Sequence, residues 1–458
     1  MDDVKNTAFK QLSPVEAQPV VVPVLPPDPN AHLTQEERDA ADSRLIRRLD
    51  WNLLPWLCIL YLLAFLDRTN IGNAKISGLE NGTHLVGDQY NISLTIFFIP
   101  YSLCLEPVTN VILKKWRPSV FIPIIIFGGL AAARWFLGLA ECGLFPGVNY
   151  YLSCWYKRSE FGTRAAIFFS SAALAGSFGG LLAAGIERMD GIGNLEGWRW
   201  IFILEGLLTI VFGVASFWMV YDFPAEARFL TDADRARVIH RLSLDQQSSA
   251  EPEEWSMKHV RAALRDWKTW LGMFIYAGCL MPVYALSLFL PSIIRELGMS
   301  QDVVRNQLLT VPPYAVGASL TVLVGFLADK TRQRGIWNII VSCFGIAGFA
   351  MLLGSKDPTV QYAGTFLGAA GVVIGWGNLN GIVSSNIYRH APRYLEGHGI
   401  VLGYLVIFLF GGSILMRLML QVENKKRREG LRDHMAQGRD YHEFAALGDQ
   451  RPDFYYTV

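Results

Sequence analysis

Charged residues are scarce in this sequence. Only 18% of its 458 residues are Asp, Glu, Lys or Arg, whereas 52% are hydrophobic and the mean hydropathy is +0.27. A chain this apolar is not expected to be an ordinary water-soluble protein. The formal net charge of only +1 provides no general attraction to nucleic acid, so we expect no nucleic-acid partner.

Motifs for covalent chemistry are missing as well. The sequence has no phosphate-binding loop, no nucleophile–base motif and no cluster of residues with metal-ligand spacing. Its six cysteines lie in or beside apolar runs, where we interpret them as small packing residues. We therefore expect no enzyme, no cofactor or metal, and no ATP-driven pump.

Long apolar runs are abundant. A run of about 20 apolar residues is long enough to cross a bilayer as a helix. Ten apolar segments cover about 52–66, 92–113, 120–155, 165–186, 200–221, 269–293, 308–328, 336–354, 361–388 and 399–420. They predict an all-α polytopic membrane protein in the lipid bilayer. A polar stretch between the fifth and sixth segments indicates a transporter built from two related halves.

The distribution of polar residues predicts the domain organisation. We expect an N-terminal tail (1–50) that ends in a short amphipathic helix, an N-terminal helical bundle (51–221), a linker (222–268), a C-terminal helical bundle (269–420) and a C-terminal tail (421–458). Basic residues cluster in both tails, in the linker and in several loops. By the positive-inside rule these clusters face the cytosol, so both termini are expected to be cytosolic.

Charged side chains inside the apolar segments mark candidate sites, because such residues are costly in hydrocarbon. Asp67 and Arg68 end the first segment, and Arg134 and Glu141 lie seven residues apart on one helix face. A guanidinium can bind a carboxylate through two hydrogen bonds, and a poorly hydrated carboxylate can exchange a proton near neutral pH. These two acid–base sets predict either proton-coupled anion binding or ion pairs that hold helices together.

Other polar residues in the segments leave more than one interpretation. Glu205, near the entrance of a segment, is interpreted as a packing residue. Tyr276 and Tyr284 are candidate aromatic walls of a substrate cavity, with simple packing as the alternative. The amide of Asn378, in GWGNLNG, can bind substrate or a neighbouring helix.

Small residues recur at every fourth position of the fourth segment, at Ala172, Gly176, Gly180 and Ala184. This spacing lets two helices approach closely. It predicts a packing contact, and a contact on which the two halves rock is the functional alternative.

Several motifs together indicate a family. FLDRTNIGNAK, RWFLGLAECGLFPGVNYYLSCWYKRSE, FLADKTRQRG, GWGNLNGIVSSNIY and LGDQRPDFYYTV resemble the fungal anion:cation symporters of the major facilitator superfamily. Within that family the chain is similar to high-affinity nicotinic acid transporters, with allantoate and vitamin permeases as relatives. The resemblance implies twelve helices in two bundles, a central cavity and proton-coupled uptake of a small organic anion. A monocarboxylate or vitamin is implied, and nicotinate is the preferred substrate.

The resemblance also implies roles for the charged residues in the segments. Asp67 and Glu141 match the proton-coupling positions of the family. Arg68 and Arg134 match positions that bind the substrate anion or relay charge. The protein is expected to act as a monomer in the plasma membrane.

Two loop motifs match gating positions of the family. WYKRSEFGTR implies that Glu160 and Arg164 latch helix ends at the cytosolic face. GFLADKTRQRG implies that Asp329 and either Arg332 or Arg334 are gate residues.

The chain departs from the family at two junctions, before Leu130 and between Gly371 and Val372. Helices 3/4 and 10/11 of the family look fused or truncated there, which leaves about ten visible spans where the family has twelve. If each fused run crosses the membrane once, the basic clusters that follow it change sides; if it folds back, they do not. A non-transporting truncated isoform or a nutrient sensor is therefore the alternative to a transporter.

Overall fold

The computed structural model describes residues 33–83, 85, 87–103, 138, 141, 143–244, 261, 264–331, 333–370, 383–384, 386–388, 393–435, 451–452 and 454–456. Every regular element in this part of the chain is helical. The longer helices are α2 (Gln35–Ile76), α4 (Gln89–Leu103), α8 (Leu144–Ser153), α9 (Arg158–Ile186), α10 (Gly197–Met219), α11 (Asp232–Leu244), α13 (Trp267–Glu296), α14 (Val303–Thr331), α15 (Arg334–Gly354), α16 (Pro358–Ala370), α18 (Leu395–Tyr404) and α19 (Gly412–Arg428). A π-helical turn, η4 (Leu405–Gly411), joins α18 to α19, and the short elements are α3 (Leu79–Gly82), η1 (Glu187–Met189), η2 (Ile192–Asn194) and η5 (Asp433–Met435).

Seven helices in the described ranges are long and apolar enough to cross a membrane. They contain seven of the ten predicted segments, namely those in α2, α9, α10, α13, α14, α15 and the α18–α19 run. The segments at 92–113, 120–155 and 361–388 are described only in part, as α4, α8 and α16. The two predicted junctions lie outside the described residues.

The outer face of α10 shows why these helices suit a bilayer. Ile203, Leu207, Val211, Val214 and Trp218 are exposed on it. Their spacing places them on one side of the helix, away from the buried side. Such a continuous apolar surface is unfavourable in water and is covered by lipid in a membrane-spanning helix.

The helix predicted before residue 50 is present, but it is continuous with the first span and is not short. Thr34 and Glu37 form the expected capping box, but α2 then continues for 42 residues. Leu45, Leu49 and Leu53 are all buried. This stripe, at every fourth residue, runs from the polar segment into the apolar one, so the same face packs throughout and nothing ends the helix.

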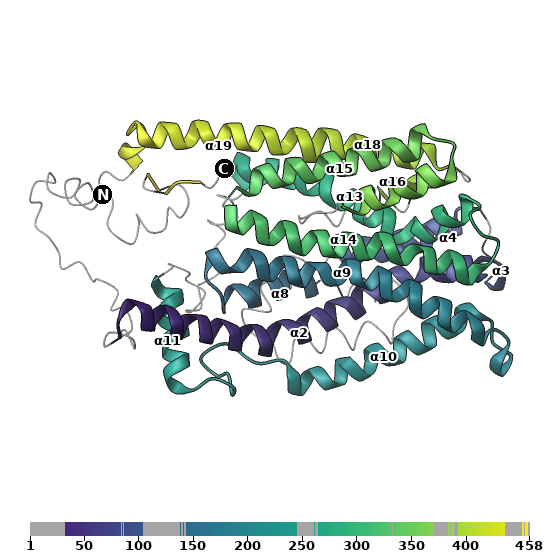
Figure 1. Ribbon diagram of the computed structural model, residues 1–458, viewed down its shortest axis with the longest axis horizontal. Coiled ribbons are helices and arrows are strands. Elements are labelled where there is room, and N and C mark those ends of the chain that lie inside the picture. The colour runs from purple at the N-terminus through teal and green to yellow at the C-terminus, as the bar shows by residue number, and fades with distance from the viewer. Residues whose placement is uncertain are drawn as a thin grey trace, which may run out of the picture.

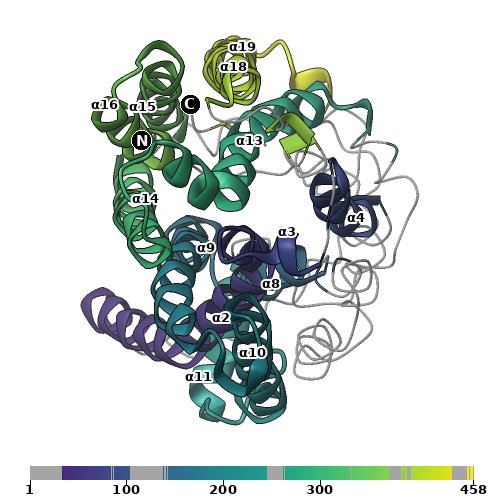
Figure 2. The ribbon, with the colours of Figure 1, turned by 90° about the vertical axis from the view of Figure 1, so that its right-hand side faces the viewer.

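The helices form two groups. Seen along the long axis, α2, α8, α9 and α10 make one group, and α13 to α16 with α18 and α19 make the other (Figure 2). The most extensive contact between any two described elements joins α9 to α14, one from each group. A Cβ added to Gly176 of α9 would lie 2.7 Å from the ring of Tyr314 of α14. The predicted close helix contact at this glycine is therefore confirmed.

Charged contacts gather where α2, α9 and α13 begin and where α14 and α19 end, on the left of Figure 1. We call this the α11 end, and the opposite end the α3 end. At the α11 end Arg48 of α2 pairs with Asp234 of α11 at 3.0 Å, and Arg164 of α9 pairs with Asp50 of α2. The basic residues before the first span, after residue 155 and in the linker thus lie at the same end. The arrangement in which these clusters do not change sides is the one observed.

Candidate functional site

A buried ion pair lies in the middle of the molecule. Nη2 of Arg68, on α2, lies 3.0 Å from Oε2 of Glu141, and each side chain is only 4% exposed. Buried charges persist only when they are paired, so this contact neutralises both groups. The structure therefore joins one member of each predicted acid–base set. Arg134 lies outside the described residues.

Aromatic rings surround the guanidinium of Arg68. Its Cζ lies 4.3 Å from the ring centroid of Tyr101, 5.1 Å from that of Phe65 and 5.3 Å from that of Phe97. Ring faces attract a cation at these distances, and more strongly where water is excluded. Tyr101 and Phe97 were not identified from the sequence, although their spacing of four residues places them on one face of α4.

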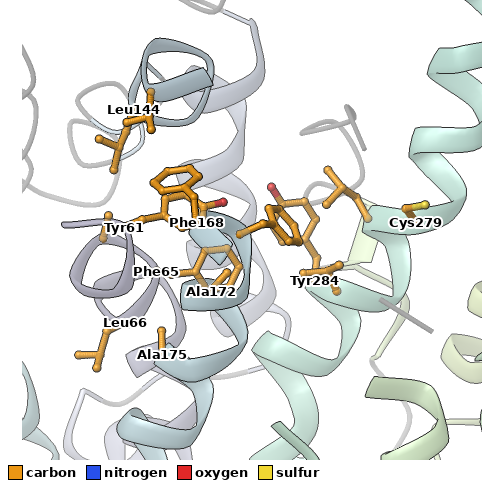
Figure 3. Packing of buried hydrophobic residues seen from close by; sticks show 14 of the residues in the cluster. Tyr61, Phe65, Leu66, Leu144, Phe168, Ala172, Ala175, Cys279 and Tyr284 are labelled. Atoms are coloured by element: carbon orange, nitrogen blue, oxygen red, sulfur yellow. The ribbon is translucent and has the colours of Figure 1, made fainter. Parts of the chain in front are cut away.

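Arg68 also lines a small cavity between the two groups of helices. The walls include Tyr61 from α2, Tyr101 from α4, and Tyr276 and Tyr284 from α13. Figure 3 shows Tyr61 and Tyr284 approaching this region from opposite sides. The cavity has a volume of about 10 Å³, which is the space for roughly one water molecule. Both tyrosines that the sequence suggested as cavity walls thus lie beside Arg68, whereas Asn378 lies outside the described residues.

A second cavity continues from the first. It is almost entirely apolar and has a volume of about 30 Å³. Phe65, Phe169 and Val283 line both cavities, and Thr69 and Tyr314 line only the second. The ion pair therefore borders a row of small spaces that lies between the two groups.

The hydrogen bonds of Arg68 are incomplete. Nη2 donates to Glu141, but the buried Nε has no hydrogen-bond partner within the described ranges. A buried donor without a partner costs about 1–3 kcal/mol. An acceptor that enters the cavity would relieve that cost.

Asp67 has a different neighbour, although it is adjacent to Arg68 in the chain. Successive helical residues point about 100° apart, so these two side chains leave α2 in different directions. Asp67 is close enough to Glu205 of α10 to interact with it electrostatically. Glu205 is eight residues inside α10 and 2% exposed. No pattern in the sequence indicates that it interacts with another acid.

The predicted gate residues lie at the α11 end. Arg164 donates from Nε and Nη2 to the two oxygens of Asp50, at 3.0 and 2.8 Å. Glu160 pairs with Arg241 of α11, which also lies 3.0 Å from a carboxylate oxygen of Asp42. These partners were not identified from the sequence. They tie the ends of α2 and α9 to each other and to the linker.

Hydrogen bonds between side chains connect the groups of helices at both ends. At the α11 end, Asp329 of α14 accepts from the hydroxyl of Thr163 of α9 at 2.8 Å. At the α3 end, Gln307 of α14 donates to the hydroxyl of Ser77, which follows α2, at 3.0 Å. The two groups of helices are therefore in contact at both ends. Arg332 and the side chain of Arg334 lie outside the described residues.

The family model of the Major Facilitator Superfamily matches residues 57–416. The chain belongs to this superfamily. It is thus a multi-pass membrane transporter, and the all-helical fold agrees with that assignment.

Several fungal transporters are similar to the chain along most of its length. An uncharacterised transporter of Schizosaccharomyces pombe is 35% identical over 446 residues, which cover 88% of this chain and 87% of the relative. The MFS transporter prlL of a fungal species is 36% identical over 384 residues, covering 79% and 77%. A high-affinity nicotinic acid transporter of Saccharomyces cerevisiae is 28% identical over 461 residues, covering 91% and 85%. Among solved structures, a bacterial homologue of the human lysosomal transporter Spinster matches with a TM-score of 0.47 and 18% identity, covering 87% and 89%.

Proposed function

We propose that this transporter carries a small organic anion together with a proton. The observation that supports the proposal is the buried pair of Arg68 and Glu141 on the wall of a cavity between the two groups of helices. The guanidinium can hold a substrate carboxylate, and Glu141 can hold the proton. Asp67 and Arg134 are proposed to assist in coupling and in anion binding, as the family resemblance implies.

The pair suggests how the two cargoes are linked. While Glu141 is ionised, it occupies the guanidinium of Arg68. Protonation of Glu141 removes that competitor, and the substrate carboxylate replaces it without adding net charge to the buried site. The free Nε of Arg68 supplies a second donor for a bidentate contact. Proton and anion are therefore expected to load together.

Release requires the two groups of helices to move. A space of about 10 Å³ is too small for an organic anion, so the wall formed by Tyr101, Tyr276 and Tyr284 has to open. We propose that the groups rock on the α9–α14 contact. The bond between Thr163 and Asp329 breaks when the site opens to the α11 end, which we assign to the cytosol. The bond between Gln307 and Ser77 breaks when the site opens to the other side.

The aromatic walls favour a flat or apolar carboxylate. Nicotinate meets this description, and the similarity to a yeast high-affinity nicotinic acid transporter adds support at the level of a distant relative. A monocarboxylate or vitamin of similar size is the wider class. We propose the plasma membrane as its location.

Uptake measurements test the proposal. The protein is reconstituted into liposomes, and uptake of labelled nicotinate and of a panel of monocarboxylates is followed with and without an inward proton gradient. We expect uptake of at least one carboxylate to rise with the gradient and to collapse with a protonophore. Glu141→Gln should keep exchange of labelled for unlabelled anion but lose accumulation driven by the gradient.

Three results would contradict the proposal. Uptake that does not change with the proton gradient would show that transport is not coupled to protons. Normal accumulation by Glu141→Gln would show that Glu141 does not carry the coupled proton. No uptake of any carboxylate would favour a non-transporting isoform or sensor, in which the Arg68–Glu141 pair only holds helices together.

A further inference from the structure

Glu205 is a buried acid whose hydrogen-bonding capacity is unused. It lies on the inner side of α10, on the same stripe as Ile201 and Thr209, and it is 2% exposed. Neither Oε1 nor Oε2 has a hydrogen-bond partner within the described part of the chain. The hydroxyl of Thr209, one turn further along, is directed to the backbone oxygen of Glu205 at 3.1 Å and not to its carboxylate.

The described elements with the main contacts to Glu205's helix offer it no positive charge. Described elements that pack on α10 are α2, α9 and η1. From α2, the group that acts on Glu205 is Asp67, another acid. The sequence of α9 has no ionisable side chain between Arg164 and its end, and η1 contributes Glu187 and Arg188 at the α3 end of the molecule.

An ionised carboxylate in such a place is unfavourable. Within the described part of the chain it would lack both a donor and a counter-charge, and the charge of Asp67 would oppose it. Ionisation of one acid therefore makes ionisation of the other less favourable, so the two protonation equilibria are coupled. The environment therefore contrasts with that of Glu141, whose charge is balanced by Arg68.

We propose that Glu205 is a second proton-binding residue, which is coupled electrostatically to Asp67 and acts separately from the Arg68–Glu141 pair. The inference rests on the proposed proton coupling and deepens it. Asp67 precedes Arg68 in α2, so a movement of this part of the helix on anion binding changes the distance from Asp67 to Glu205. The proton on Glu205 is then held or released according to the state of the substrate site.

The stoichiometry of transport tests this role. In liposomes, the number of protons that enter with each anion is measured for the wild type, Glu205→Gln and Glu196→Gln. Glu196 is the N-cap residue of α10, and its side chain is 50% exposed and paired with Arg199. It therefore serves as an exposed control next to the same helix. We expect Glu205→Gln to carry one proton fewer per anion while exchange of labelled for unlabelled anion stays within about twofold of wild type. Glu196→Gln should match the wild type in both measurements.

Labelling of the wild-type protein gives a test that does not depend on transport or on the folding of a variant. An apolar carbodiimide reacts with protonated carboxyl groups in apolar surroundings, and mass spectrometry locates the adduct. We expect an adduct on Glu205 whose yield decreases as the pH is raised.

The outcomes separate this inference from the proposed function. Proton-coupled uptake with an unchanged stoichiometry in Glu205→Gln overturns the role of Glu205 and leaves the proposed function intact. The absence of a pH-dependent adduct on Glu205 also overturns it. If the adduct depends on pH but anion uptake does not depend on the proton gradient, Glu205 is a proton-binding residue and the proposed proton-coupled transport is wrong.

Discussion

Arg68 and Arg164 each pair with a carboxylate, but the two pairs differ in burial and in completeness. Arg164 donates two hydrogen bonds to Asp50 and a third, from Nη1, to the backbone oxygen of Glu160 at 3.1 Å. Its side chain is 17% exposed and that of Asp50 is 30% exposed. Arg68 donates one bond to Glu141 from a site that is almost fully buried, and its Nε has no partner among the described residues.

The difference separates a structural contact from a site that can bind a ligand. Near the start of α9, a complete pair fixes the helix against α2, and all three nitrogen atoms of Arg164 donate a hydrogen bond. In the middle of the molecule, an incomplete pair beside a cavity retains a donor, and its carboxylate can be displaced. Burial makes the second pair sensitive to any change in its charge.

The largest expected effect comes from replacing each arginine by lysine. Arg68→Lys should reduce anion uptake by about a hundredfold, because an ammonium cannot make the bidentate contact and a buried charged hydrogen bond is typically worth about 2–5 kcal/mol. Arg164→Lys should reduce it only severalfold. Initial uptake rates, normalised to protein in the membrane, measure both. Equal losses in the two variants would remove the distinction between the two pairs.

A glycine substitution should produce the next largest effect. Gly176→Ala would place a Cβ 2.7 Å from the ring of Tyr314, and overpacking of this kind costs about 1–3 kcal/mol. The control is Gly185→Ala on the same helix, where nothing lies within 4 Å of the added carbon. We expect a lower thermal midpoint and slower uptake for Gly176→Ala alone. If both variants behave like the wild type, the α9–α14 contact is not the surface on which the groups move.

Loss of the Arg164–Asp50 pair, near the start of α9, should have a smaller effect on the protein. Asp50→Asn should destabilise the protein by roughly 0.5–1.5 kcal/mol, since the pair is partly exposed and screened by solvent. Substrate affinity should not change. Thermal unfolding and equilibrium binding of the transported anion are measured on the same preparation. A loss of affinity without a loss of stability would place Asp50 in the binding site and contradict the structural role assigned to the Arg164–Asp50 pair.

The smallest effects should come from the hydrogen bonds that close the two ends. Each is expected to contribute about 0.5–1.5 kcal/mol to its closed state. Thr163→Ala should therefore favour opening to the α11 end and Gln307→Ala opening to the α3 end. Ser287 lines the apolar cavity. Ser287→Cys is introduced into a protein without its native cysteines, and its rate of labelling by a thiol reagent added from one side of the membrane measures these shifts. Shifts in the same direction would refute the assignment of the two gates.

The sequence was sufficient for the class of fold. Apolar length and the linker predicted a two-part helical membrane protein, because both follow from composition alone. Intramembrane charges identified Arg68 and Glu141, because charge in an apolar segment is rare and costly. The leucine stripe that makes α2 continuous was also readable at Leu45, Leu49 and Leu53, but the polar residues between them obscured it.

The partners of these residues could not be predicted. Asp67 and Arg68 look like a pair in the sequence, yet Asp67 interacts electrostatically with Glu205 and Arg68 pairs with Glu141. Pairing across the bundle depends on how α2, α4 and α10 pack, and no local pattern encodes that. For the same reason, Tyr101 and Asp50 became visible only in three dimensions.

We propose that a substrate carboxylate replaces Glu141 on Arg68 when Glu141 takes up a proton. This exchange is tested by the pH dependence of equilibrium anion binding, measured for wild type and Glu141→Gln with the carboxylate that the protein transports. In the wild type, affinity should fall as the pH rises, by up to about tenfold per pH unit for one linked proton. In Glu141→Gln the dependence should be smaller by one proton, because the competing carboxylate is gone. The same pH dependence in both proteins would show that protonation of Glu141 is not linked to anion binding.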